Sequence, residues 1–199
     1  MPGQIKIDDG AGNYTILTNA GSLGSDKTIT IPNTTGTVAL TSDITSGLTE
    51  ADMWYLTANV TSNGDITSNL SRQSGTLVSK IGTGMTESSG IFTFPNTGYW
   101  LVTARTLAIN ISGDTITCFI VATNDNFSTE ANVGIAKFGS NSSTSPTGGT
   151  GYGEVILDIQ DVSNDKVKFL ASSITSGSYL TGGTQPDATN FSFIRLGDT

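Results

Sequence analysis

The side chains best suited to chemistry in this chain are carboxylates and amides, because none of its 199 residues is a histidine. Without histidine, the usual general base at neutral pH, the serine-histidine-aspartate triad and histidine-ligated zinc are all excluded. Cys118 is the single cysteine, so neither an internal disulfide nor a thiolate zinc site can form. We expect Cys118 to be a buried apolar residue in a strand; a reactive thiol is the alternative.

Two groups of oxygen-bearing side chains remain as candidates for chemistry. One consists of Asp158, Asp161 and Asp165, and the other is the Asn-Asp-Asn run 124–126. Calcium needs about six to eight oxygen ligands, and neither group alone offers them. Glycoside cleavage needs two opposed carboxylates in a sugar groove, which sequence spacing does not show. We interpret these residues as turn formers and predict no catalytic residue, no metal and no cofactor.

Two long breaks between apolar runs, 139–152 and 176–190, are the predicted loops of the chain. The glycine-rich run 148–151 lacks the Lys and Ser or Thr of a phosphate-binding loop, so we expect a flexible tip there. Long loops on a rigid β scaffold often carry binding sites, and tolerated surface insertions are the alternative. Tyr152 and Tyr179 are the predicted ligand contacts, because aromatic side chains offer contact area at low entropic cost.

Composition and charge restrict the fold and the partners. The chain has 24 glycines and runs rich in Thr, Ile, Val and aromatic residues, which favours many short strands joined by turns. Its 17 acidic and 9 basic residues give a net charge of −8. Because an acidic chain has no long-range attraction to phosphate or anionic lipid, we predict neither nucleic acid nor membrane insertion. No secretory signal or membrane span is recognisable, so synthesis in a cytoplasm is expected.

The strongest structural signal is the stretch 84–109, in which two apolar runs flank the turn 95–98. We also predict strands at 54–60, 75–82, 115–122, 131–138, 153–159, 166–172 and 191–196. The strands do not alternate with helical patterns, which argues against a parallel α/β sheet. The predicted fold class is therefore all-β, an antiparallel sandwich or barrel.

The amino-terminal part differs from the rest. Residues 1–42 offer too little apolar surface to offset the ordering of the chain, which costs about 1–2 kcal/mol per residue. We predict an arm at 1–42 that needs a partner, a short linker at 43–56 and a head at 57–199 whose first strand begins near 53. Thr49 and Asp52 have the spacing of a helix-capping pair, which predicts a helical turn in the linker.

A first resemblance lies in residues 27–43, KTITIPNTTGTVALTSD. The segment resembles one that recurs in tailed-phage fibre and virion-appendage proteins, where a strand-turn-strand piece ends a trimeric shaft. An ordinary surface hairpin is the alternative. The resemblance implies an attachment and trimerisation arm, and its apolar residues are the predicted docking contacts: Ile29, Ile31, Pro32, Val38 and Leu40.

A second resemblance covers about residues 53–199. The pair 90–95 and 97–102, the run 153–168 and the closing strand 190–196 are similar to the globular heads of complement C-one-q and tumour-necrosis-factor proteins. The family implies an antiparallel jelly roll of about ten strands that trimerises through apolar and aromatic side chains. The aromatic residues predicted for the core or for the trimer seam are Phe92, Phe94, Tyr99, Trp100, Phe191 and Phe193. The collagen-like stalk of these proteins is missing, so the arm would take its place.

Together the two resemblances imply a non-enzymatic structural protein on the exterior of a phage virion, made in the host cytoplasm. A homotrimeric capsid decoration, cement protein or short appendage, docked on other virion proteins, is the first expectation. The alternative is a receptor-binding tail-fibre knob that recognises a host glycan or surface protein. Capsid or tail location, and the choice of aromatic residues for the seam, are left open by the sequence.

Overall fold

The structure is a computed structural model. It describes most of the chain after residue 46 and three short segments before it: 5–8, 10–11, 14–17, 47–111, 115–140, 146–183 and 188–199. Two compact units are present, Met1–Ile44 and Thr45–Thr199. In the first unit, β1 (Ile5–Asp8) and β2 (Tyr14–Leu17) form an antiparallel pair. The second unit is the head.

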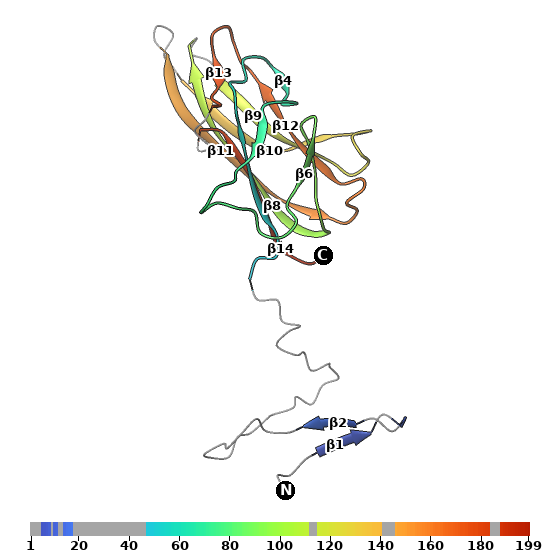
Figure 1. Ribbon diagram of the computed structural model, residues 1–199. Helices are drawn as coiled ribbons and strands as arrows, with labels where there is room; N and C mark the ends of the chain where they lie inside the picture. Colours follow the sequence, from blue (N-terminus) through green and yellow to red (C-terminus); the bar gives the residue numbers. More distant parts are fainter. Residues whose placement is uncertain are drawn as a thin grey trace. The chain divides into compact units, whose positions relative to one another are not determined.

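Strands and turns, but no helix, make up the described residues of the head (Figure 1). The front sheet has the order β11-β8-β14-β3-β5, with β13 beside β8, and the back sheet has the order β10-β9-β12-β7-β6, with β4 beside β12. The front strands are β3 (Ala51–Leu56), β5 (Leu70–Arg72), β8 (Gly98–Asn110), β11 (Thr147–Ile159), β13 (Tyr179–Leu180) and β14 (Asn190–Gly197). The back strands are β4 (Gly64–Asp65), β6 (Thr86–Ser88), β7 (Ile91–Thr93), β9 (Thr115–Thr123), β10 (Ala131–Gly139) and β12 (Lys166–Ser172).

The chain passes repeatedly between the two sheets. From β7 in the back sheet it enters β8 in the front, then β9 and β10 in the back, β11 in the front, β12 in the back and β14 in the front. All pairings within the sheets are antiparallel. This alternation between two packed antiparallel sheets is the arrangement of a jelly roll. The predicted all-β jelly-roll sandwich is therefore confirmed.

The core between the sheets is built from aromatic residues that alternate along the strands. Phe169 of β12 stacks on Phe191 of β14 with ring centroids 3.8 Å apart. Phe92 of β7 packs against Phe193 of β14 at 5.0 Å and against Trp54 of β3 at 5.3 Å. Such pairs contribute about 0.5–1.5 kcal/mol beyond the burial of their surfaces. The rings therefore join the two sheets into one domain.

Half of the first predicted loop, 139–152, belongs to strands. Residues 147–152 belong to β11, so the expected flexible tip at 148–151 is wrong. The reason is a close approach between the sheets along β10 and β11. A Cβ at Gly149 would lie 1.9 Å from the ring of Phe138, and one at Gly153 would lie 2.2 Å from the carbonyl oxygen of Ile135. The glycines allow two backbones to pack closely, which in a strand is one of the roles of glycine.

The linker also differs from the prediction. β3 begins at Ala51, and residues 47–50 form no helical turn. The Asp52 side chain, expected to cap a helix, instead accepts hydrogen bonds from the Trp54 indole and the Met85 amide inside the head. The run 75–82 is not a strand either, although Ile81 forms an isolated bridge with Ala51. Tertiary hydrogen bonds outweigh the local capping pattern here.

Candidate functional site

Strand β8, which lies next to the middle strand of the front sheet, is apolar on both of its faces over residues 99–102. Trp100 and Val102 point into the core and are fully buried, whereas Tyr99 and Leu101 lie on the opposite, outer face. A sheet that meets water on one side usually alternates apolar and polar residues, and a continuous apolar run indicates that both faces are covered. In the single chain only the inner face is covered. The outer face of the front sheet is therefore a candidate interface, and we call it the front face.

An aliphatic row crosses this face perpendicular to the strands. Ile194 of β14 pairs with Leu101 of β8 on one side and with Ala51 of β3 on the other. Leu101 pairs in turn with Ile156 of β11, and Ala51 pairs with Ile81 through two backbone hydrogen bonds of 3.1 and 2.8 Å. Because directly paired residues share a face, the five side chains form one continuous row. The register, rather than any sequence neighbourhood, brings them together.

Much of this apolar surface is open to solvent. Ile156 is 60% exposed, Ile81 45% and Tyr99 43%, and Met53 of β3 adds a further 39% exposed side chain beside the row. Contiguous apolar patches of this kind mark sites of association on soluble proteins. The loop that carries Ile81 also presents Leu77, which is 96% exposed at its tip. The front face is thus the part of the head best suited to bind another protein surface.

A buried acidic pair holds that loop against the sheet. The Asp52 carboxylate accepts hydrogen bonds from Arg72 Nε at 3.0 Å and from Met85 N at 2.8 Å. Glu50 accepts from the Gly84 amide at 2.9 Å and from Asn96 Nδ2 at 3.0 Å. Buried carboxylates need such donors, because an uncompensated charge inside a protein is costly. The pair fixes the end of the loop and so places Ile81 in the aliphatic row.

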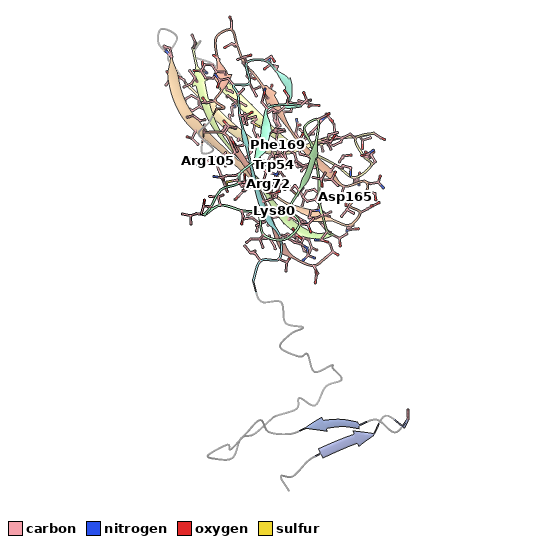
Figure 2. The ribbon with its side chains drawn as sticks, viewed as in Figure 1. Trp54, Arg72, Lys80, Arg105, Asp165 and Phe169 are labelled. Carbon is pink, nitrogen blue, oxygen red and sulfur yellow. The ribbon has the colours of Figure 1, made fainter. Side chains whose placement is uncertain are left out.

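A shallow hollow of about 430 Å³ lies beside the row, lined by Met53, Gln73, Leu101, Thr103, Arg105, Tyr152, Asn190, Ser192 and Ile194. Arg105 projects from β8, directly opposite Tyr152 of β11 and Asn190 of β14. Figure 2 places Arg105 at the margin of the head, away from Trp54 and Phe169 near its middle. Among the described residues, no carboxylate forms an ion pair with Arg105. This hollow is therefore basic, although the chain as a whole is acidic.

The predicted aromatic residues divide between the core and the front face. Five are buried between the sheets: Phe92, Phe94, Trp100, Phe191 and Phe193. Tyr99 alone of the six is exposed, on the front face. Tyr152 lies in β11 and not in a loop, and its hydroxyl donates to Glu154 Oε2 at 2.7 Å, which raises the pKa of Tyr152. Tyr179 lies in β13, opposite Ile109 of β8.

The structure does not place the predicted docking contacts of the arm. Ile29, Ile31, Pro32, Val38 and Leu40 lie outside the described residues. The structure therefore leaves their role as it was predicted from the sequence.

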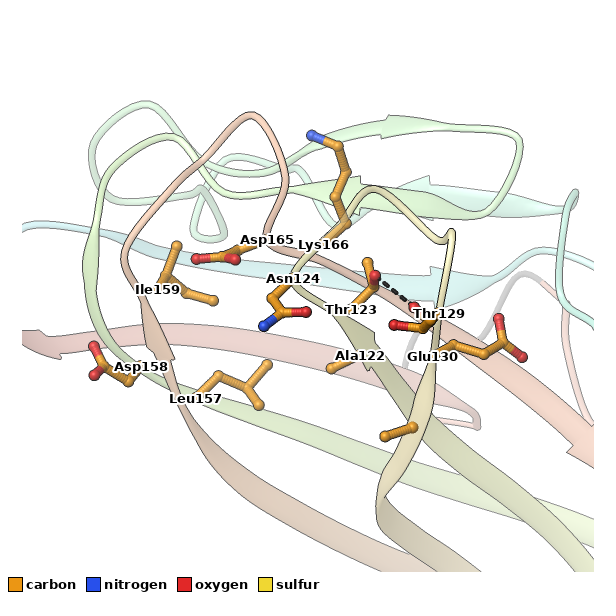
Figure 3. A pocket seen from close by; sticks show the side chains of 11 residues that line it. Ala122, Thr123, Asn124, Thr129, Glu130, Leu157, Asp158, Ile159, Asp165 and Lys166 are labelled. Atoms are coloured by element: carbon orange, nitrogen blue, oxygen red, sulfur yellow. Dashed lines mark hydrogen bonds between the residues drawn. The ribbon is translucent and has the colours of Figure 1, made fainter.

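A second hollow, of about 350 Å³, lies at one end of the sandwich (Figure 3). The loop after β9 and the loop after β11 form its walls, joined by a hydrogen bond of 3.0 Å from Asn126 N to the Asn164 carbonyl. Asn124 and Leu157 point toward each other across it, with Asp158 nearby. The structure thus brings together the two polar groups that lie far apart in the sequence.

Three carboxylates near this hollow accept hydrogen bonds from groups in the adjoining turns. Asp125 accepts hydrogen bonds from the Thr129 amide and hydroxyl and from Thr123, which lower its pKa. Asp161 accepts from the Ser163 amide, and Asp165 accepts from the Gln160 and Asp161 amides at 2.7 and 2.8 Å. These bonds agree with the turn-forming interpretation for Asp125, Asp161 and Asp165. Asp158 differs from it, because it lies within strand β11. Within the described ranges, no three acidic, cysteine or histidine side chains are arranged to hold a metal ion.

Sequence reasoning missed most of the front face. Met53, Leu101, Ile156, Ile194 and Arg105 were not singled out, because each is unremarkable by itself. A usable signal does exist in uninterrupted apolar runs such as 99–102 and 155–157. A run of that kind in a sheet without covering helices predicts that a second surface covers the outer face.

The comparisons with known proteins identify the fold. No protein-family model and no curated protein sequence matches the chain. Among solved structures, Eiger TNF from S. frugiperda matches with a TM-score of 0.58 at 16% identity, over 75% of this chain and 93% of that one. Murine APRIL at pH 5.0 matches with a TM-score of 0.56 at 12% identity, over 74% and 98% of the two chains. At these identities the likeness concerns the fold alone: the head is a jelly roll of the kind found in these TNF-type structures.

Proposed function

We propose that this chain is a non-enzymatic structural protein of a phage virion, a homotrimeric component of its exterior surface. The head is displayed outward as a capsid decoration, cement protein or short appendage. The arm at 1–42 docks on other virion proteins and assists trimerisation. The front face forms the seam between the heads.

The aliphatic row is the observation that carries this proposal. Five apolar side chains from five strands or loops form a continuous outer surface, and the most exposed of them, Ile156, has 60% of its surface in contact with water. Covering such surface contributes about 25 cal/mol per Å². Tyr99, the exposed member of the predicted aromatic set, lies on the same face. Closed rings of identical subunits are the common outcome when a chain associates with its own copies.

The phage assignment rests on the arm. Its segment 27–43, KTITIPNTTGTVALTSD, resembles one that recurs in fibre and appendage proteins. The head has its own core and is a separate compact unit, so it should fold without residues 1–42. Deleting these residues should leave a folded head that no longer joins particles. Normal incorporation of the truncated head would contradict the docking role of the arm.

Native mass spectrometry and sedimentation equilibrium of the full chain test the assembly. A trimer at micromolar concentration is expected, and a stable monomer at that concentration would refute the proposal. The number of copies per particle then separates the two locations. Hundreds of copies indicate capsid decoration, whereas a few or a few tens indicate a fibre or tail part.

A receptor-binding knob of a tail fibre is the second candidate function. The hollow of about 350 Å³ at the end of the sandwich supports it, because an amide and a carboxylate, Asn124 and Asp158, lie beside the apolar Leu157. Sites for small ligands combine an apolar lining with a few placed polar groups. A glycan array probed with the isolated head is the test. Binding that Asn124→Ala removes would favour recognition over architecture.

A further inference from the structure

We propose that Arg105 of one copy forms an ion pair with Glu154 of a neighbouring copy when front faces meet in the assembly. The inference deepens the proposed function and rests on it. It assigns a specific polar contact to a seam whose other described members are largely apolar. The occupant of the basic hollow is therefore a carboxylate from a second copy of this chain.

Within one chain, the two residues are near each other but unpaired. Arg105 pairs in register with Tyr152, and Glu154 pairs with Thr103, so they are diagonal neighbours on adjacent strands. Diagonal neighbours on a sheet are within reach of long side chains. Nevertheless, the ion pairs of the described residues involve other side chains, and the Glu154 carboxylate accepts only the Tyr152 hydroxyl. Both charges are thus available to a partner on the front face.

Covering the aliphatic row creates a need for a counter-charge beside Arg105. Arg105 lies in the same hollow as Leu101 and Ile194, two members of the row. A surface that covers them also removes the guanidinium from water, and a buried charge without a counter-charge is strongly unfavourable. Guanidinium groups bind carboxylates through two parallel hydrogen bonds, which gives the contact a defined geometry.

A second copy supplies the required carboxylate. The front face carries Glu154 and, opposite Tyr99, Asp158, so the same surface holds both charge signs. In a closed ring, the Arg105 of each copy then pairs with the Glu154 of the next copy, so every Arg105 has a counter-charge. The chain has a net charge of −8, and local complementarity would offset part of the repulsion between copies. Tyr152 acts as a positioning residue, because its hydroxyl holds Glu154 beside the hollow.

A charge-swap experiment on the full chain tests the pair. Sedimentation equilibrium is run on the wild type, on Arg105→Glu, on Glu154→Arg and on the double variant that carries both changes. Each single reversal should weaken association at least tenfold, and the double variant should recover association to within about threefold of the wild type. Lys137→Glu, an equal change of charge at an exposed position of β10 in the back sheet, is the matched control and should leave association unchanged.

The outcomes separate this inference from the proposed function. A trimeric wild type whose association survives Arg105→Glu overturns the ion pair alone, and a double variant that stays dissociated overturns Glu154 as the partner. A monomeric wild type overturns both proposals. If a reversal prevents folding, as judged by circular dichroism, mixing Arg105→Cys with Glu154→Cys provides a second test. With oxidised glutathione added as the oxidant, a disulfide between the two chains is expected, and its absence from an assembled mixture counts against the contact. Cys118 should not compete, because it is buried.

Discussion

Replacing Ile156 by serine should dissociate the assembly without unfolding the head. Ile156 is 60% exposed in the single chain, so that part of its surface remains to be covered by a partner. Fully burying an isoleucine side chain contributes about 1.5–3 kcal/mol, and 60% of this is about 1–2 kcal/mol for each contact. Three equivalent contacts in a trimer amount to about 3–5 kcal/mol. At about 1.4 kcal/mol per factor of ten, the association constant should fall by about 10²- to 10⁴-fold.

The assay is sedimentation equilibrium over a range of protein concentrations, together with urea denaturation of the dissociated head. The free energy of unfolding of the head should change by only about 0.5–1 kcal/mol, because position 156 is exposed in the monomer and contributes mainly strand propensity. Ile111→Ser, at a site 38% exposed beyond the end of β8, is the control. Equal effects of the two substitutions on association, or no effect of Ile156→Ser, would refute the assignment of the seam to the front face.

Three further predictions concern the scaffold of the head. Asp52→Ala should lower the free energy of unfolding by about 2–4 kcal/mol in urea denaturation. The reason is that the indole of Trp54 and the partly exposed guanidinium of Arg72 lose their acceptor. A loss below about 1 kcal/mol would contradict this role of Asp52. Gly153→Ala should destabilise the head by about 1–3 kcal/mol, since the new Cβ would lie 2.2 Å from the carbonyl oxygen of Ile135. Gly75→Ala, with open space around the new Cβ, is the control. Burial raises the pKa of Cys118 from 9.0 to about 12, so its contribution to stability is fully present below pH 9 and is lost as the pH rises toward 12. Urea denaturation across this pH range should show a decline that Cys118→Ala reduces, and equal slopes would contradict the burial of the thiol.

Much of the fold follows from local patterns. The turn at 95–98 lies between β7 and β8, where Pro and Gly punctuation predicts it, and the runs predicted at 115–122, 131–138 and 166–172 agree with β9, β10 and β12 to within a residue. Runs rich in β-branched and aromatic residues between turn-rich breaks identify these strands. The absence of helical periodicity correctly predicts the all-β class.

The errors occur where contacts between distant residues outweigh local preference. The glycines of β11 have the composition of a loop, yet they are required because β10 passes within van der Waals distance of their backbone. Thr49 and Asp52 have the spacing of a helix cap, yet the carboxylate is held by Arg72 and Met85. No local pattern reveals these partners, since they are 20 and 33 positions away from Asp52 in the chain.

In the candidate interface, too, some features follow from the sequence and others only from the tertiary structure. The sequence alone determines that the chain has no histidine, a single cysteine and a net charge of −8, and its patterns predict an antiparallel β sandwich. It also supplies apolar residues for both faces of β8. Only the tertiary structure decides that Trp100 faces the core while Leu101 faces outward, and that Leu101 stands in one row with Ile156 and Ile194. The physical reason is strand register: backbone hydrogen bonds between segments far apart in sequence determine which side chains share a face.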